Sequence, residues 1–537
     1  MERFGRQKIQ ELINQLSDDP NPNIRLLVEI TTFLLEQVAL QKELNQELRD
    51  EIARLKGNNP RPTIRPSTLE KRKKPSKKKG KKKKRPGSEK RSKTAELTIH
   101  ETVFITPEAI PEGSRFLGYE NFTVQDIKFC AHNTQYRRAR WLTPEGKVIS
   151  GELPKALSGK HFGSTLVCFI LYEYYHAHVT QPLILEQLRE IRIDISAGKL
   201  NEIITEGKEV FHEEKEAILE VGLEVSDYIH VDDTGARHQG HNGYCTHIGN
   251  ELFAYFESTA SKSRLNFLKI LRGKATDYIV NEEALEYMSR QKLPNYQLDK
   301  LRTTKERTLN DEDAWSSFLG GQGIEKPSHV RIATEGALLG SIIEKDINPE
   351  IVIMSDGAGQ FNILLHALCW IHAERIIKKL LGIGKANKKA LKEIRRRIWE
   401  LYDDLKSYKI APDPEKKVEL SKRFDDIFTT ETCYASLNLA LERLNKNKAE
   451  LLLVLDHPEI PLHNNLSERD IREYVKRRKI SGSTRSETGR KCRDTFTSLK
   501  KTCRKLGISF WEYLKDRITG EGLISPLSQI IRRRATP

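Results

Sequence analysis

Three acidic residues stand where a carboxylate would be held on a rigid element and could bind a metal ion. Asp232 follows the β-forming run 228–231, Asp356 follows the apolar run 351–354, and Glu468 falls in the first turns of a predicted helix. Mg²⁺ prefers oxygen ligands and keeps several waters, so a few carboxylates suffice to hold it. Two such ions activate the attacking oxygen and stabilise the leaving oxygen in phosphoryl transfer. These residues therefore predict a phosphoryl-transfer site that binds Mg²⁺ or Mn²⁺, with two ions.

Each acid also has a purely structural explanation. Asp356 precedes Gly357, which is an ordinary turn signal, and the helix dipole alone favours an acid at the position of Glu468. The order along the chain favours catalysis, because two strand-end aspartates followed by a helical glutamate match the acidic triad of a ribonuclease H-like fold. We therefore expect an α/β protein with a ribonuclease H-like catalytic core.

The predicted strands and helices assemble this core from separate segments. Residues 228–259 read as three consecutive strands with a tight turn at 241–243. A helix at 263–271 and a polar stretch at 273–349, which looks like an insertion, come next. After the buried strand that precedes Asp356, the apolar positions from Leu364 to Ile376 follow at helical spacing.

The charge of the chain is concentrated in one run. The 537 residues have a formal net charge of +16, and residues 71–93 hold fifteen Lys and Arg against one acid. This run has no apolar residue to pack, so we expect a disordered linker. Its lysines, including Lys77, Lys78 and Lys82, are denser than a solvated tether needs, which favours contact with nucleic-acid phosphates.

The segments on either side of the linker allow alternatives. Heptad spacing over residues 24–56 predicts a coiled coil and a homo-oligomer, although an amphipathic helix packed on its own chain would show a similar pattern. A period of two from residue 97 predicts a small β domain, whose cations and aromatics at 136–141 fit a solvated face better than a nucleic-acid contact. Short helices over 156–222 either form a DNA-binding helix-turn-helix or only pack together.

A helical insertion is predicted to split the core, and its charged helices either help to hold DNA or pack on the core. Dense cations after Glu468 suit a surface that faces phosphates. From the N-terminus we expect a coiled coil at 1–57, a disordered Lys-rich linker at 58–96, a small β domain at 97–155, a helical segment at 156–222, the first part of the core at 223–375, the helical insertion at 376–458, the last part of the core with the glutamate helix at 459–520, and a basic tail at 521–537.

Cysteine usage and hydropathy indicate the compartment. The seven cysteines include no CxxC pair and lie in apolar or helical stretches, which fits a reducing cytosol. The N-terminus lacks a signal-peptide pattern, and no apolar run is long enough to span a membrane. We expect a cytoplasmic protein without a membrane partner.

Four segments resemble those of the DDE transposases of the insertion sequence 66 family, and the likeness covers roughly residues 160–515. They read HVDDTGAR at 230–237, IVIMSDGAGQFNILLHALCWIHAER at 351–375, IPLHNNLSERDIR at 460–472, and RRKISGSTRSETGRKCRDTFTSLKKTCRKLGISFWEYL at 477–514. The family often carries a four-cysteine zinc segment before its core, whereas this chain has only Cys130 in that region.

The resemblance implies an enzyme that cleaves the ends of a mobile element and joins them to target DNA. It makes Asp232, Asp356 and Glu468 the catalytic metal ligands. Three further residues would support the site, namely Asp233, His372 and Asn465. Cations near the glutamate would contact DNA, namely Arg469, Arg472, Arg477, Arg478, Lys479 and Arg485.

The resemblance also implies a prokaryotic, nucleoid-associated protein that binds element ends and target DNA and works with accessory proteins encoded by the element. Two other functions stay open. One is a structure-selective nuclease that uses the same triad but never joins DNA. The other is a catalytically inactive DNA-binding regulator derived from a transposase.

Overall fold

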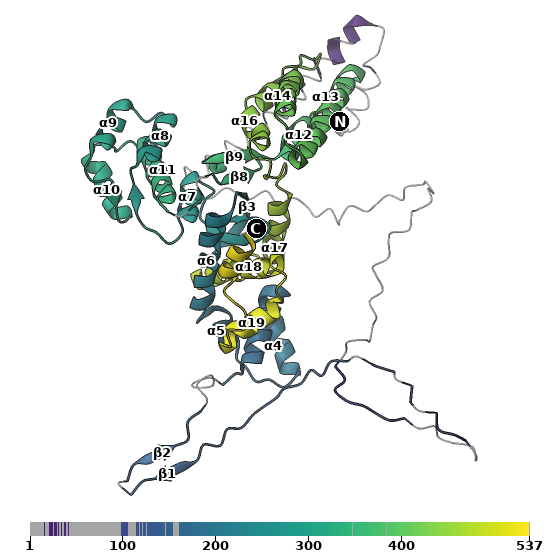
Figure 1. Ribbon diagram of the computed structural model, residues 1–537, viewed down its shortest axis with the longest axis vertical. Coiled ribbons are helices and arrows are strands. Elements are labelled where there is room, and N and C mark those ends of the chain that lie inside the picture. The colour runs from purple at the N-terminus through teal and green to yellow at the C-terminus, as the bar shows by residue number, and fades with distance from the viewer. Residues whose placement is uncertain are drawn as a thin grey trace, which may run out of the picture.

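A mixed sheet of five strands runs through the centre of the computed structural model, in the order β5-β4-β3-β8-β9 (Figure 1). Strands β3, β4 and β5 form an antiparallel meander, and β8 and β9 continue the sheet parallel to β3. Their bounds are β3 Tyr228–His238, β4 His241–Gly249, β5 Ala254–Thr259, β8 Val352–Ser355 and β9 Leu365–Leu368. The predicted meander and the predicted strand before Asp356 are confirmed. The strand predicted to end at Asp232 instead continues to His238, because its pairing with β4 extends through Asp232 to the turn before His241.

The structure describes residues 161–535 except 346, 349 and 383, residues 98–105 and 114–153 with isolated gaps, and scattered positions between 16 and 41. The coiled coil predicted over 1–57 falls almost wholly outside the described residues. The linker predicted over 58–96, with Lys77, Lys78 and Lys82, lies entirely outside them.

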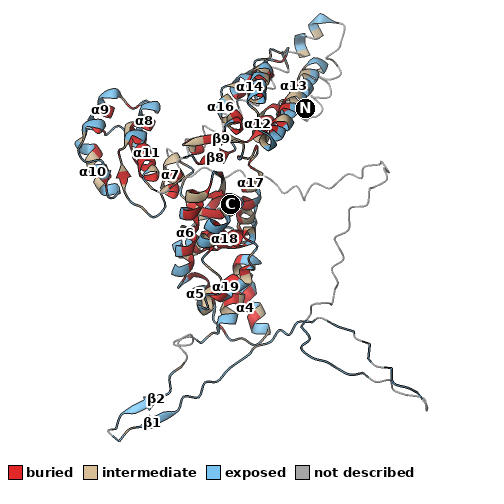
Figure 2. Cartoon of the chain, in the orientation of Figure 1, coloured by how far each residue is buried: buried red, intermediate tan, exposed pale blue. Residues whose placement is uncertain are grey.

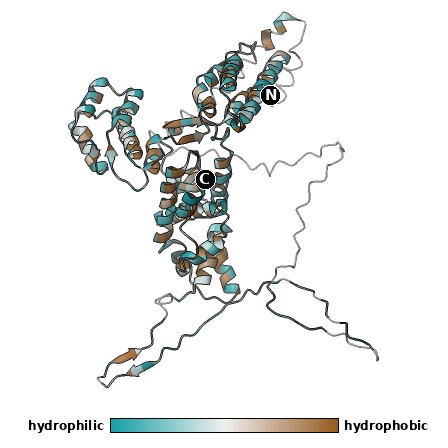
Figure 3. Ribbon diagram, in the orientation of Figure 1, coloured by the Kyte–Doolittle hydropathy of each residue, from teal (hydrophilic) through white to brown (hydrophobic). Residues whose placement is uncertain are grey.

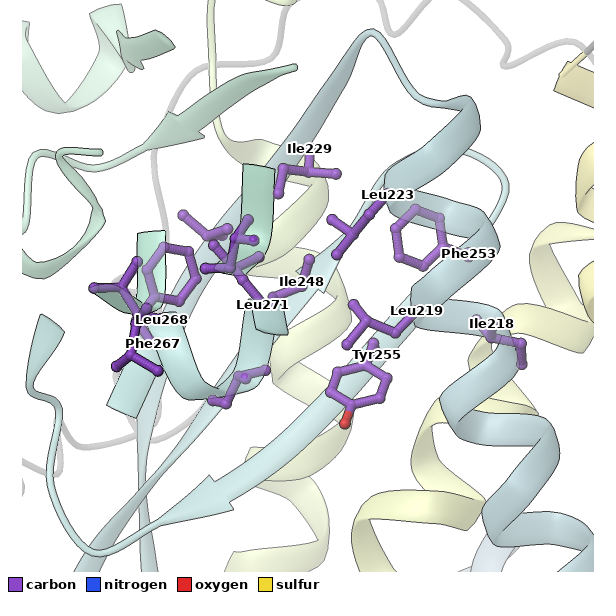
Figure 4. Close-up of a cluster of buried hydrophobic side chains, with 14 of the residues drawn as sticks. Ile218, Leu219, Leu223, Ile229, Ile248, Phe253, Tyr255, Phe267, Leu268 and Leu271 are labelled. Atoms are coloured by element: carbon purple, nitrogen blue, oxygen red, sulfur yellow. The ribbon is translucent and has the colours of Figure 1, made fainter. Parts of the chain in front are cut away.

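Helices α6 (Glu209–Val225) and α7 (Arg264–Arg272) cover one face of the sheet. Their apolar side chains pack on alternate residues of the meander, among them Ile229, Ile248 and Tyr255 (Figure 4). Successive side chains of a strand point to opposite faces, so the intervening residues are directed away from α6 and α7.

Helix α17 and the predicted helical insertion cover the opposite face. Ile471 and Tyr474 of α17 (Asn465–Ser481) pack on Phe256 and its neighbours in the meander. The insertion packs, with α12, on Val352 of β8 and its neighbours. Helix α12 spans Trp370–Lys378. The helices of the insertion are α13 Lys385–Ile410, α14 Pro414–Phe428, α15 Ala435–Asn445 and α16 Lys448–Leu452, followed by a 3₁₀ turn at Leu453–Leu455. The helices predicted for this insertion are confirmed.

Residues 364–368, which were predicted to begin a helix, instead lead into and form the edge strand β9. Leu364 has a left-handed φ of 52°, and the next four residues pair in parallel with β8. Helix α12 begins only at Trp370. A short apolar run fits a buried helix or a buried strand equally well, and the pairing with β8 makes this one a strand.

The polar stretch 273–349 folds into a helical lobe beside the sheet (Figure 1). Its core includes Trp315 stacked on Tyr278 with ring centroids 5.4 Å apart. Helix α11 also packs on α7, which connects the lobe to the covered face of the sheet. The lobe contains β6 Tyr278–Ile279, α8 Glu282–Arg290, α9 Asn295–Thr303, β7 Thr308–Leu309, α10 Glu312–Gly321 and α11 Pro327–Ile343.

The helical segment predicted over 156–222 is helical, and it packs with the C-terminal helices. It contains α3 Ser164–Leu171, a π-helical turn at Tyr172–His176, α4 Gln181–Glu190, α5 Ala197–Thr205 and most of α6. Helix α19 (Phe510–Thr519) packs on α3. The segment predicted as a basic tail instead forms α20 (Leu527–Ala535), because Leu527 and Ile531 share one helical face that is buried against α6.

The small β domain predicted over 97–155 appears only as one hairpin among the described residues. Strands β1 (Arg140–Leu142) and β2 (Val148–Ser150) pair antiparallel, and all of their residues are exposed (Figure 2). Within the described part of this segment, the hairpin lacks the apolar core that an independent domain needs.

Polar and apolar residues alternate along most of the helices (Figure 3). Across the described ranges, every helix is either too short or too polar to pass through a bilayer.

The outer edge of strand β5 is closed by side chains of helix α18 (Glu487–Lys505). Every second N–H of the strand donates to an acceptor that recurs every fourth residue of the helix. The pairs are Ala254 to Thr502 Oγ1 at 3.1 Å, Phe256 to Ser498 Oγ at 2.9 Å and Ser258 to Asp494 Oδ2 at 2.8 Å. Four helical residues rise about 6 Å and two strand residues about 6.6 Å, so acceptors and donors stay in step.

We predict that Ser498→Ala lowers the free energy of unfolding by about 1–3 kcal/mol, because the buried N–H of Phe256 loses its acceptor. Denaturant titration of the full chain measures the change. Ser407→Ala is the control, since that exposed hydroxyl donates to the Asp403 carbonyl of its own helix. Equal losses in the two variants would contradict the role given to α18.

Candidate active site

Strands β3 and β8 place Asp232 and Asp356 side by side. The strands pair in parallel with His230 opposite Met354, and each aspartate lies two residues farther along its own chain. Neighbouring strands are about 4.8 Å apart, so the two carboxylates lie beside each other, Asp232 within β3 and Asp356 just past the end of β8. Asp356 is exposed there, and its Oδ1 accepts a hydrogen bond from the Ala358 N–H at 3.1 Å.

The Asp232 carboxyl lies half-buried in negatively charged surroundings. Burial raises its pKa to about 8, and the carboxylates of Asp356, Asp233 and Glu468 add to the rise against a hydrogen bond from the Asp233 N–H. All three predicted acids are thus close enough to influence one another. Among the described residues, the charges that act most on Asp232 are acidic, and a bound cation would offset them.

Glu468 contacts two cationic or titratable side chains of helix α12. Its Oε1 lies 3.2 Å from Arg375 Nη1 and 3.5 Å from His372 Nε2. Burial, with a further contribution from Arg375, lowers the pKa of His372, so the imidazole is neutral at pH 7. The structure therefore brings the predicted His372 to the glutamate and adds Arg375, which the sequence pattern did not single out.

Asp233 points to the opposite face of the sheet from Asp232. Its Oδ1 accepts a hydrogen bond from Thr246 Oγ1 at 2.6 Å, and its Oδ2 accepts one from Gln360 Nε2 at 2.8 Å. Burial raises its pKa, and these two hydrogen bonds oppose the rise. Asp233 therefore ties β3 to the loop after β8, while Asp232 is left on the side of helix α17.

The buried side chain of Asn464 connects three segments of the site. Its amide donates to the Val231 carbonyl at 2.8 Å, and its Oδ1 lies 2.8 Å from His230 Nδ1. Its backbone N–H donates to Cys369 Sγ at 3.2 Å, at the start of α12. One residue thus fixes the strand of the first aspartate, the segment after β9 and the helix of the glutamate.

Asn464 makes the contacts that connect these segments, and the supporting role of Asn465 stays a prediction. Asn465 is the first residue of α17 and is partly exposed, and its carbonyl lies 3.4 Å from Arg469 Nε. Consecutive residues at a helix start point in different directions. The Asn-Asn pair alone therefore does not reveal which amide reaches strand β3.

The cations predicted to contact DNA fall into two groups. Four are exposed and available to a ligand, namely Arg469, Arg472, Lys479 and Arg485. Arg477 is buried: its Nη1 donates to the Tyr174 carbonyl at 2.7 Å, and its guanidinium lies 3.9 Å from the centre of the Tyr174 ring. Arg478 donates to Thr234 Oγ1 at 3.2 Å and so braces β3. The DNA contact predicted for Arg477 is corrected to a structural contact.

The acids have the chemistry that Mg²⁺ or Mn²⁺ requires, because Asp232, Asp356 and Glu468 all offer carboxylate oxygens. Over the described ranges, however, no three His, Cys, Asp or Glu side chains lie close enough together to coordinate one ion. Glu468 is engaged by Arg375. Coordination by all three acids would therefore require its side chain to leave that arginine.

Two comparisons relate the chain to other proteins. The sequence profile described as "Transposase IS66 family" matches residues 341–492, a range that includes Asp356 and Glu468. A protein of Sinorhizobium fredii named "Uncharacterized protein y4jO" is 43% identical over 321 residues, which are 59% of this chain and 100% of that protein.

We predict that Asn464→Ala destabilises the chain by about 2–4 kcal/mol, because it removes two side-chain bonds and leaves buried groups of β3 without partners. Thermal unfolding measures the change. Asn465→Ala is the matched control from the adjacent position and should shift stability by less than about 0.5 kcal/mol. The same loss in both variants would contradict the assignment of the connection to Asn464.

We also predict that the Asp232 carboxyl contributes a loss of stability to the metal-free chain as the pH rises from about 4 to 8, which is measured as the difference between the wild type and Asp232→Asn. An aspartyl pKa is ordinarily about 3.9, whereas that of Asp232 is about 8 in the folded chain, so only the folded state keeps the proton between these values. Asp232→Asn should raise the free energy of unfolding at pH 8 by on the order of 1–3 kcal/mol and change it little at pH 4.

Denaturant titrations at both pH values in a chelator test this dependence. The exposed Asp313→Asn serves as the control and should leave the pH profile unchanged. A profile for Asp232→Asn that follows the wild type would show that Asp232 does not hold the proton.

Proposed function

Because this chain belongs to the insertion sequence 66 family of transposases, we propose that it is a DDE transposase that cleaves the ends of an insertion sequence and joins them to target DNA. One observation carries the proposal: Asp232, Asp356 and Glu468 come from three distant segments, and the charges of the latter two raise the pKa of the first. Carboxylates with perturbed pKa values that gather in one place are typical of catalytic sites.

The sheet supports a ribonuclease H-like interpretation of the core. A three-strand antiparallel meander begins the sheet, and two parallel strands extend it beyond β3. Asp232 lies on β3, Asp356 follows β8, and Glu468 is on the helix that packs across this end of the sheet. Ligand sites of open sheets with parallel strands lie at the carboxyl ends of those strands.

The proposed reaction consists of two in-line displacements at phosphorus. In the first, a water oxygen bonds to the phosphorus and the 3′-oxygen of the element end leaves with a proton. In the second, that 3′-hydroxyl attacks a target phosphodiester and a new 3′-oxygen leaves, so one bond forms for each bond broken. Mg²⁺ or Mn²⁺, as two ions held by the three acids, would supply activation of the attacking oxygen and charge neutralisation of the leaving oxygen.

The neighbouring side chains would orient the DNA. Arg375 offers a fork of N–H donors suited to a phosphate oxygen once Glu468 turns away from it. His372 is neutral at pH 7 and so adds no charge of its own. Gln360 and Asn464 hold the backbone beside the aspartates through Asp233 and Val231.

The partners follow from this reaction. The family membership implies DNA binding, and we propose that the DNA comprises element ends and target. We further propose a homo-oligomer that works with accessory proteins of the element in association with the nucleoid. An oligomer would bring two ends together before joining.

One observation favours a second candidate, a catalytically inactive regulator that binds DNA. Glu468 is paired with Arg375, and the described residues hold no assembled group of three ligands. In a regulator this ion pair would be permanent, whereas in a transposase it would open when metal and DNA bind.

The test is a reaction with Mg²⁺ or Mn²⁺ on labelled duplexes that carry the repeats flanking the gene. We predict cleaved and joined products with the wild type, and a loss of both by at least about 100-fold in Asp356→Asn and Glu468→Gln. Loss of a direct metal ligand should lower activity more than loss of a residue that only orients a ligand, for which the decrease is roughly 10–100-fold.

The products separate the candidates. Cleavage without joining would identify a structure-selective nuclease. DNA binding without any reaction, with and without added accessory proteins, would identify the regulator. Equal activity in all three proteins would overturn the assignment of the acids, and Asp313→Asn controls for the loss of an acid elsewhere.

A further inference from the structure

An open cleft lies between the end of helix α12 and the first half of α13. It has a volume of about 410 Å³ and is lined by Lys378 of α12 and by residues of α13 that include Lys388, Leu391, Lys392 and Trp399. The α13 residues recur every three, four or seven positions and therefore form one stripe along the helix. We call this feature the α12–α13 cleft.

The cleft is strongly cationic. Residues 378–399 contain nine Lys and Arg against one acid, Glu393. Two of the arginines are neutralised, because Arg395 pairs with the buried Glu374 and Arg396 pairs with Glu393 and Glu400. The lysine side chains of 378 and 392 are exposed, and neither has an acidic partner among the described residues. Their charge is therefore available to a ligand.

The walls of the cleft are fixed before any ligand binds. The Arg395–Glu374 pair ties α13 to α12, and Glu374 is only 4% exposed. Trp399 is 36% exposed and is held edge-on by Tyr402, with ring centroids 5.2 Å apart. An exposed, oriented aromatic ring on the same surface as lysines is typical of surfaces that hold nucleic-acid backbone and stack on bases.

Helix α12 connects the cleft with the candidate active site. His372 and Arg375 contact Glu468 at one end of the helix, and Lys378 lines the cleft at the other. Lys378 lies about 9 Å along the helix axis from His372, at 1.5 Å per residue. Phosphates of one strand of B-DNA follow at about 3.4 Å along its axis, so this span corresponds to about three base pairs.

We propose that the α12–α13 cleft binds the DNA backbone about three base pairs from the reacting phosphodiester, with Lys378 and Lys392 on phosphates and Trp399 against a sugar or an unpaired base. The proposal rests on the proposed function, because it places DNA at Glu468. The uncompensated cations favour DNA over a second copy of this chain, whose approach would bring the same positive surfaces together.

Binding of the full chain to the end duplex, measured against salt concentration in a chelator, tests the proposal without any reaction. Each phosphate contact contributes about 0.9 to the slope of log affinity against log salt. Lys378→Gln combined with Lys392→Gln should therefore reduce the slope by about 2. Lys416→Gln combined with Lys422→Gln is the matched control, because it removes two exposed charges from α14 of the same insertion and should leave the slope unchanged.

Trp399→Phe gives a local readout. DNA should quench part of the tryptophan fluorescence of the wild type, and that part should be lost in Trp399→Phe and when the duplex is cut back to the reacting phosphodiester. Circular dichroism establishes that each variant is folded.

Equal slopes for the cleft variant and the control, with an unchanged quench, would overturn the proposal. An unchanged slope with altered sedimentation of the cleft variant would also overturn it and assign the cleft to a second copy of the chain. These results are separate from catalysis. A reduced slope for a protein that never cleaves DNA would support DNA binding in the cleft and refute the transposase. An unchanged slope for a protein that cleaves and joins DNA would refute DNA binding in the cleft and support the transposase.

Discussion

The candidate site depends on the hydrogen bonds of one buried amide. Asn464 joins the Val231 carbonyl, His230 and Cys369, and these residues belong to segments that are far apart in the sequence. Because this amide is buried, its hydrogen bonds matter for stability. A polar atom left without a partner there would have given up its hydration with no hydrogen bond to replace it. The relative positions of β3, α12 and α17 are therefore determined by a residue that carries no charge.

The charges around helix α17 are distributed unevenly between its two sides. Asp470 and Glu473 face lysines of α18, with Lys505 and Lys500 among them, and the pKa of each acid is lowered by histidine and lysine partners that outweigh burial. Asp232, in contrast, has acidic neighbours and a raised pKa. The fold thus places cations beside the acids that anchor the helix, whereas the charges that act on Asp232 of β3 are acidic.

Sequence patterns predicted the strands and helices whose apolar residues recur regularly, and the acidic residues that follow apolar runs. The strand that carries Asp232, the strand before Asp356 and the helices of the insertion were predictable because burial imposes a regular spacing. The continuation of β3 past Asp232 to His238 was not, since it depends on pairing with β4. Strand β9 was not predictable either, since only pairing with β8 distinguishes it from a helix. The contacts of Asn464, Arg375 and Arg477 depend on side chains that meet across 93 to 303 residues of sequence, and no local pattern predicts such contacts.

The side chains of α18 that accept hydrogen bonds from strand β5 have a consequence for synthesis of the chain. They lie 236 to 248 residues after their partners, so the ribosome exposes the edge strand long before its cover exists. At about 5–20 residues per second, that delay lasts on the order of 10–50 s. An unpaired edge is a template for joining another chain. Nascent chains on one polysome are therefore most prone to aggregate through β5 during this interval, and a chaperone that binds extended segments would act there.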